Sequence, residues 1–392
     1  MASPSVALRC LGPALEIAQA VTEAGGEELR NCYQCGTCTA VCPWGNLKAF
    51  SPRTFVEMAR LGLEGFEEDA WTCVNCKTCW DRCPQQINIP LIFQSVRSIL
   101  REWNAQPSTM NAPLGSLRSE GNPWGEKKSA RETWARSAEV QGVTPATEHL
   151  LFTCCTNDYE ARSRRDARAV VDVLRSAAVD FGYLGNAQRC CGDLALTVGD
   201  GAVFEKLQGA NVEQIEKAGV ASLLAVSPHC LHSFKNRYVY PGGEAPAVRH
   251  VTEIYAEHLA KGSLRPTRTI ERRVTYHDPC YLGRYNDIYD APRDVLRALP
   301  GLELVEMPHH RETSLCCGGG GGGIWIDTPK GKRLSDIRVL EALGVEATVI
   351  AAACPYCVQM LESSIVSMDL EDKLRVMTVS ELLAEALSEA EA

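Results

Sequence analysis

Cysteine is the residue type whose number and spacing in this sequence could do chemistry. The chain has 19 cysteines among 392 residues, and eight of them fall into two copies of the pattern C-x2-C-x2-C-x3-C-P. The first copy runs from Cys32 to Pro43, and the second runs from Cys73 to Pro84. Three thiolates spaced in this way can wrap three corners of a 4Fe-4S cube, and the fourth cysteine then points at the neighbouring cluster. The pattern therefore predicts two 4Fe-4S cubanes.

The crossing of the fourth cysteines defines the expected ligand sets. One cubane takes Cys32, Cys35, Cys38 and Cys83, and the other takes Cys73, Cys76, Cys79 and Cys42. Tandem zinc fits this spacing less well, because structural zinc sites pair two widely separated C-x2-C units. Disulfides fit poorly with the reducing cytoplasm in which we expect the chain to work.

A second repeat joins cysteines that stand farther apart in the sequence. Its two copies are Cys155, Cys190, Cys191 and Cys230, and then Cys280, Cys316, Cys317 and Cys357. Each copy contains an adjacent cysteine pair followed by glycine, which allows the turn that brings diverging neighbours together. Two neighbouring thiolates suit a site in which one sulfur bridges irons. The segment C-P-Y-C adds Cys354, so five thiolates can converge in the second copy; inert buried cysteines are the alternative.

Apolar periodicity predicts the elements that hold these cysteines. Residues 89–103 keep helical spacing, and Ser51 with Pro52 forms an N-cap and first turn. Farther on, short apolar runs alternate with amphipathic stretches, which is typical of an α/β fold. The runs 150–152, 223–226, 274–276 and 349–353 end at or near a cysteine. The cysteines are therefore expected at the carboxyl ends of strands, where open sheets bind ligands.

Composition and charge exclude several classes of partner. Lys and Arg number 40 against 49 Asp and Glu, which gives a net charge of -9, so a nucleic acid or an anionic membrane would bind against the overall field. No apolar run reaches the length of about 18 residues that a transmembrane segment needs. The N-terminal region 1–26 lacks the features of a signal peptide. We therefore expect a cytoplasmic chain without a nucleic-acid partner or a transmembrane segment.

Several motifs resemble one known family, the fused catalytic iron-sulfur subunit of heterodisulfide reductase and its relatives. They are H-D-P-C-Y-L-G-R-Y at 277–285, C-C-G-G-G-G-G-G-I-W at 316–325, C-P-Y-C at 354–357 and G-N-P-W-G at 121–125. The similarity runs from about residue 28 to the C-terminus. It implies a non-cubane 4Fe-4S cluster, at which disulfides can be reduced, on Cys280, Cys316, Cys317, Cys354 and Cys357.

The expected fold is α+β and multidomain. An all-α ferredoxin domain with two 4Fe-4S motifs (1–103) precedes a linker (104–145) and two duplicated α/β Cys-Cys-Gly domains (146–265 and 266–392). The helix between the two cubane motifs is similar to that of helical two-cluster ferredoxin domains in succinate dehydrogenase and heterodisulfide reductase subunits. Pro, Gly, Ser and charged residues in the linker indicate a segment laid over the surface.

The first Cys-Cys-Gly copy departs from the family pattern. Ser227 stands where the family has the first cysteine of C-P-x-C, and Cys154 looks a poor replacement, because neighbours on a strand point to opposite faces. Three outcomes remain open. The domain holds an iron-sulfur site on Cys155, Cys190, Cys191 and Cys230; its site is empty or merely structural; or it binds another metal such as zinc, with help from His229 or His232.

Thiolate-ligated clusters store and pass single electrons, and the sequence has no flavin fingerprint or P-loop. We therefore expect an oxidoreductase subunit of an anaerobic cytoplasmic complex, which passes electrons between a flavoprotein partner and the C-terminal Cys-Cys-Gly cluster through the two cubanes. The layout is similar to the electron-transfer subunit of the ATP-independent benzoyl-CoA reductase complex. The alternatives are a catalytic heterodisulfide or disulfide reductase, and the iron-sulfur subunit of a glycolate, lactate or glycerol-3-phosphate dehydrogenase. No residue receives a catalytic role.

Three lesser features carry weaker expectations. His277 and Asp278 form either a proton-donating pair or a packed histidine beside a turn-capping aspartate. The glycine run 318–323 follows Cys-Cys rather than a strand, which favours close backbone approach or a mobile gate over nucleotide binding. Cys10 stands apart from every motif and is expected to be a small core residue.

Overall fold

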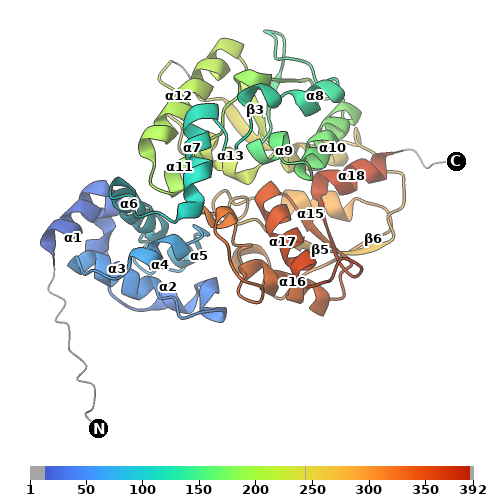
Figure 1. Cartoon of the computed structure of the whole chain (residues 1–392). Helices are drawn as coiled ribbons and strands as arrows, with labels where there is room; N and C mark the ends of the chain where they lie inside the picture. The colour runs from blue at the N-terminus through green and yellow to red at the C-terminus, as the bar shows by residue number, and fades with distance from the viewer. Residues whose placement is uncertain (1–13, 243, 389–392) are drawn as a thin grey trace. The chain divides into compact units, whose positions relative to one another are not determined.

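The computed structural model of the chain describes residues 14–242 and 244–388. The expectation for Cys10 lies outside these residues. The chain divides into two compact units (Figure 1). One unit extends to Cys73 and includes Lys77–Gln106, and the other combines Val74–Cys76 with the chain from Pro107 onward.

The first unit is entirely helical, as the sequence predicts. Its helices are α1 (Leu15–Val21), α2 (Thr37–Ala40), α3 (Pro52–Leu61), α4 (Glu67–Thr72), α5 (Thr78–Asp81) and α6 (Ile89–Glu102). The N-cap at Ser51 is confirmed, because its side chain accepts a hydrogen bond from the backbone N–H of Thr54 at 3.1 Å. Phe55 of α3 and Phe93 of α6 stack with ring centroids 3.8 Å apart, so the two helices share one core.

The segment that follows differs from the expected surface linker. Residues 104–145 contain α7 (Asn111–Glu120) and α8 (Thr133–Ser137). Arg131 and Trp134 are each only 1% exposed. The segment therefore contributes to the core of the second unit, while its boundaries as a domain stay a prediction.

The second unit holds two four-stranded sheets in which every strand pair is parallel. The first sheet has the order β2-β1-β3-β4, and the second has the order β6-β5-β7-β8. The strands are β1 (His149–Phe152), β2 (Phe181–Tyr183), β3 (Ser222–Ala225), β4 (Ala247–His250), β5 (Arg272–His277), β6 (Leu302–Val305), β7 (Val349–Ala352) and β8 (Arg375–Thr378). This confirms the expected duplication, which gives a first α/β domain (β1–β4) and a second α/β domain (β5–β8).

Helices alternate with the strands in both α/β domains (Figure 1). They are α9 (Cys155–Tyr159), α10 (Ser163–Ser176), α11 (Asp193–Thr197), α12 (Gly201–Ala218), α13 (Pro228–Asn236), α14 (Val251–Ala260), α15 (Asp290–Arg297), α16 (Leu334–Gly344), α17 (Pro355–Ser367) and α18 (Val379–Leu387). The chain leaves the first strand of each sheet toward one side and returns on the other. The resulting switch points lie between β1 and β3 and between β5 and β7, and crevices at such points bind ligands.

The two α/β domains pack against each other in a reciprocal way. Helix α10 of the first domain contacts α18 of the second, and α14 of the first contacts α15 of the second. Since α10 and α15 follow the first strand of their sheets and α14 and α18 follow the last, each domain offers the same pair of helices. Arg162 reinforces this contact with ion pairs to Glu362 and Glu381, each at 2.6 Å.

Candidate functional site

A cavity in the helical unit gathers four cysteines from both cubane motifs. It encloses about 410 Å³ of empty space, and its lining includes Cys32, Cys35, Cys38 and Cys83. Cys83 belongs to the second motif, so the chain brings it beside the first three cysteines as the crossing rule predicts. Four thiols around one cavity are a donor set that fits a cubane.

The two cubane motifs adopt the same local backbone. Gly36 and Lys77 both have positive φ angles, of 83° and 67°, and they immediately precede α2 and α5. These two short helices carry Cys38 and Cys79 and contact each other. For the second predicted set, Cys42, Cys73 and Cys79 are half-buried and Cys76 is buried. The repeated loop geometry agrees with two sites of one kind.

Five cysteines of the second α/β domain meet at the carboxyl end of its sheet. Cys280 follows β5, the pair Cys316 and Cys317 follows β6, and Cys354 and Cys357 follow β7. All five are buried. Their thiols contact one another in a chain, in the order Cys280, Cys316, Cys317, Cys357 and Cys354. Gly318 has a φ of 91°, which confirms the turn expected after the cysteine pair.

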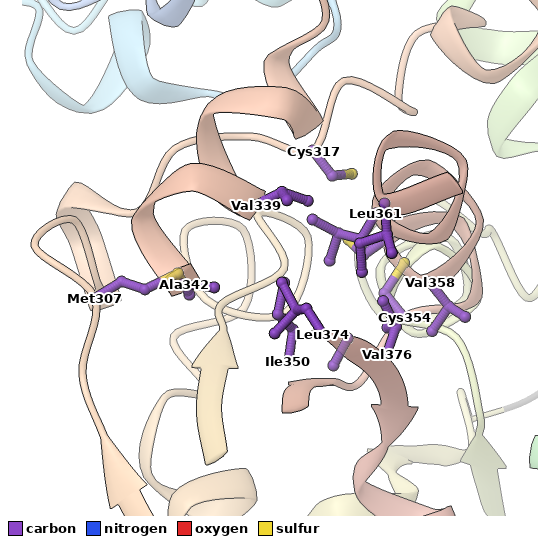
Figure 2. Packing of buried hydrophobic residues seen from close by; sticks show 13 residues of the cluster. Met307, Cys317, Val339, Ala342, Ile350, Cys354, Val358, Leu361, Leu374 and Val376 are labelled. Atoms are coloured by element: carbon purple, nitrogen blue, oxygen red, sulfur yellow. The ribbon is translucent and has the colours of Figure 1, made fainter. Parts of the chain in front are cut away.

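These thiols lie against the apolar core of the domain. Figure 2 shows Cys317 and Cys354 among aliphatic side chains of the same cluster. Hydrogen bonds from Cys316 and Cys357 hold the pKa of Cys317 well below its usual value. Burial favours a raised pKa for Cys354, but hydrogen bonds from Cys357 and His229 outweigh it and lower the pKa to about 6. The site therefore favours thiolates, which are the metal-binding form of cysteine.

His277 also faces this group of cysteines. Its ring nitrogen and the sulfur atoms of Cys317 and Cys357 all lie within 4.8 Å of one another. Its Nδ1 accepts a hydrogen bond from Arg338 Nε at 3.2 Å, which orients the ring. Asp278 is instead bound by Arg293, whose Nη1 and Nη2 donate to its carboxylate at 2.6 and 2.8 Å. The two residues thus have separate partners, which favours a packed histidine over an Asp–His proton-donating pair.

The first α/β domain brings together its own predicted cysteines and one more. Cys155, Cys190, Cys191 and Cys230 are buried at the carboxyl ends of β1, β2 and β3. The expectation that Cys154 faces away from them is wrong, because its thiol contacts that of Cys230. Strand β1 ends at Phe152, and Cys154 is the N-cap of α9, so the alternation of a strand does not apply to it.

Arg131 is a residue at this site that sequence reasoning does not select. Its Nη2 donates to Cys155 Sγ at 3.3 Å, and its guanidinium forms a buried ion pair with Asp158. Trp134 Nε1 also donates to Asp158, at 2.9 Å. Both residues come from the segment expected to be a surface linker, where no motif or spacing distinguishes Arg131 from the other charged residues.

The two histidines considered as extra metal ligands have other partners. His229 Nδ1 lies 2.7 Å from Asp193 Oδ2, and its ring stacks on Tyr281 of the second domain at a centroid distance of 3.9 Å. Burial favours a lowered pKa for His229, but Asp193 and Cys354 raise it well above its usual value. His232 Nδ1 lies 2.9 Å from Asn236 Nδ2.

The fold and the cysteine sets define an iron-sulfur protein that joins a two-cluster helical unit to a pair of cysteine-rich α/β domains. Residues 28–87 match the 4Fe-4S dicluster domain family, which implies two cubanes, and residues 149–235 and 274–362 match the cysteine-rich domain family. A relative from Methanosarcina mazei, an iron-sulfur component of the dihydromethanophenazine:CoB--CoM heterodisulfide reductase, is 30% identical and aligns over 93% of this chain and 94% of its own length. The chain belongs to the family of heterodisulfide reductase-like iron-sulfur proteins.

Other relatives are longer than this chain. The Bacillus subtilis protein named as a probable iron-sulfur-binding oxidoreductase, FadF, is 35% identical over 82% of the chain. The EtfAB:quinone oxidoreductase of Syntrophomonas wolfei is 33% identical, also over 82% of the chain. The chain spans 47% of the length of each of these two proteins.

Among solved structures, a hypothetical protein from Helicobacter pylori has the same fold. It covers 93% of this chain and is covered over 72% of its own length, with a TM-score of 0.53 and 13% sequence identity. Among the described residues, no helix is both long and apolar enough to cross a lipid bilayer.

Proposed function

We propose that this chain is the iron-sulfur electron-transfer subunit of an anaerobic cytoplasmic redox complex, which passes electrons between a flavoprotein and the cysteine-rich centre of its second α/β domain by way of the two cubanes. The observation that carries the proposal is the convergence of five buried cysteines at the switch point between β5 and β7. Clusters held by such cysteines supply one-electron storage when bound. The names of the relatives, among them an EtfAB:quinone oxidoreductase, support a flavoprotein donor or acceptor.

The ligand sets of this proposal follow from the contacts described above. Cys32, Cys35, Cys38 and Cys83 hold one cubane, and Cys73, Cys76, Cys79 and Cys42 hold the other. The five cysteines Cys280, Cys316, Cys317, Cys354 and Cys357 hold a non-cubane 4Fe-4S cluster. The role that we expect is similar to that of the electron-transfer subunit of the ATP-independent benzoyl-CoA reductase complex.

Rapid mixing with a reduced flavoprotein tests the electron-transfer role. The anoxic chain is mixed with the reduced flavoprotein encoded beside its gene, and samples are frozen at intervals for paramagnetic resonance. We expect saturable reduction of the cubane signals, and Cys317→Ala is expected to keep this reduction while losing the signal of the second α/β domain. Reduced viologen serves as the control that reduces every cluster. Reduction by viologen but not by the flavoprotein contradicts the proposal.

A catalytic disulfide reductase is the second candidate. It is favoured by the match to the Methanosarcina mazei heterodisulfide reductase component over 94% of that protein. The test is to supply the isolated chain with reduced viologen and the heterodisulfide of coenzymes M and B. Sustained thiol release that Cys317→Ala abolishes supports this candidate over an electron-transfer role, whereas no turnover supports the first proposal.

A further inference from the structure

The first α/β domain has lost one cysteine and gained another at the same level of its sheet. In the register of β1 and β3, Phe152 lies opposite Ala225, so Cys154 and Ser227 each follow their strand end by two residues. In the second domain His277 lies opposite Ala352, and the two residues at the same positions are Pro279 and Cys354. The cysteine has therefore moved from one strand end to its neighbour, and adjacent strands lie about 5 Å apart.

The thiols of the two domains make the same sequence of contacts. In the first domain the order is Cys155, Cys190, Cys191, Cys230 and Cys154. Each member corresponds to one of Cys280, Cys316, Cys317, Cys357 and Cys354 in the second domain. Cys154 thus occupies the end of the chain of contacts that Cys354 occupies in the second domain. Gly192, with a φ of 80°, makes the turn that Gly318 makes there.

We propose that the first α/β domain binds a second multi-iron cluster of the cysteine-rich type, with Cys154 as its fifth thiolate ligand in place of the missing cysteine at Ser227. The cluster is a fourth iron-sulfur centre, in addition to two cubanes and the centre of the second domain. This inference does not depend on the electron-transfer role, because it concerns what the first domain holds and not where its electrons go.

A single zinc ion fits these cysteines less well than a cluster. Among the described residues, the one group of three or more His, Cys, Asp or Glu ligand atoms lying within 4.8 Å of one another is His277, Cys317 and Cys357, in the second domain. The five thiols of the first domain extend as a chain of pairwise contacts, whereas zinc needs four ligands around one point. His229 is held by Asp193 at 2.7 Å, and is therefore not directed into this group.

The surroundings favour thiolates in the first domain. All five cysteines are buried, and the buried guanidinium of Arg131 donates to Cys155 Sγ at 3.3 Å. Burial alone disfavours negative charge, and a buried cation offsets part of that cost. A cluster with several thiolate ligands is thus compatible with this pocket of the fold.

Iron, zinc and acid-labile sulfide analysis of the anoxically prepared chain tests the proposal. We expect about sixteen irons in the wild type, since four centres each hold four. Cys154→Ala is expected to lose about four of them while both cubane signals persist. Ser227→Ala, at the opposed position, is the matched control and should keep all of them. The double variant Cys154→Ala with Ser227→Cys restores the cysteine to the other strand end and should recover the lost iron.

Each contrary outcome overturns the proposal. About twelve irons in the wild type, unchanged in Cys154→Ala, means that the first domain holds no cluster. One zinc per chain, or a Cys154–Cys230 disulfide found by mass spectrometry without the extra iron, assigns the thiols to another role. If Cys154→Ala fails to fold, the wild-type count and the double variant still decide. A failure of electron transfer from the flavoprotein changes none of these counts.

Discussion

Each group of buried thiols in the α/β domains has a cationic side chain beside it, and the two cations differ. Arg131 contacts Cys155 in the first domain, whereas His229, whose pKa is raised, contacts Cys354 in the second. His229 itself belongs to the first domain, so it acts across the boundary between the domains. The two cysteine groups therefore share one arrangement of sulfur but differ in electrostatic surroundings, and their bound clusters are expected to differ in reduction potential.

Cys35→Ala and Cys83→Ala are expected to remove the same cubane. Both side chains line one cavity, so each single variant should lose about four irons, and the double variant should lose no more than either single variant. Iron analysis with paramagnetic resonance of the reduced chain makes the comparison. A loss of about eight irons in the double variant would place Cys83 on the other cluster.

His250 is expected to make the stability of the chain depend on pH. Burial lowers its pKa to about 4, whereas an unfolded histidine binds a proton below about pH 6.5. The free energy of unfolding therefore falls as the pH drops from 6.5 toward 4. His250→Asn keeps a side-chain acceptor at the N-cap of α14 and removes the titration. Between pH 7.5 and 5, denaturant titration should show the wild type losing about 2 kcal/mol relative to this variant; parallel pH profiles would contradict the assignment.

At the scale of the elements, much of the fold is predictable because the punctuation is local. The N-cap at Ser51 and the helical spacing of 89–103 use only neighbouring residues, and both are confirmed by α3 and α6. The apolar runs of the second unit become β1, β3, β5 and β7. Parallel strands place their carboxyl ends together, so cysteines that follow such runs converge even though they are far apart in sequence.

Contacts that depend on where a strand stops are not predictable in this way. Strand alternation predicts that Cys154 points away from the other cysteines, but β1 ends at Phe152 and the next residues turn into α9, which directs the thiol toward Cys230. Arg131 lies in a segment without apolar periodicity, and its burial results from packing against Asp158, which is distant in the chain. A one-residue difference in a strand end, or a single long-range ion pair, leaves no periodic signal to read.

Arg131→Leu is expected to lower the free energy of unfolding by about 3–5 kcal/mol, because it leaves the carboxylate of Asp158 buried without its cation. Arg136→Leu in the same segment is the matched control. Its partner Glu132 lies one helical turn away and the Arg136 side chain is 75% exposed, so a change of under about 1 kcal/mol is expected. Denaturant titration under anoxic conditions measures both; equal effects would contradict the role given to Arg131.

At the scale of the whole molecule, the reciprocal contacts of α10 with α18 and of α14 with α15 join the two α/β domains. Arg162→Ala removes ion pairs to Glu362 and Glu381 and a hydrogen bond to the carbonyl of Val376 at 3.0 Å. We expect a loss of about 1–3 kcal/mol in unfolding free energy. Arg60→Ala, which removes a surface pair with Glu57, should change it by under about 1 kcal/mol. Similar losses in the two variants would mean that Arg162 does not hold the domains together.

The reciprocal helix contacts have the form of an isologous interface, in which two copies of one protein meet through the same surface. Here both copies are translated as a single polypeptide. Fusion fixes their ratio at one to one and frees each half to mutate independently, which two identical chains encoded by one gene cannot do. A cysteine could thus migrate between adjacent strand ends in one half while the other retained the ancestral spacing.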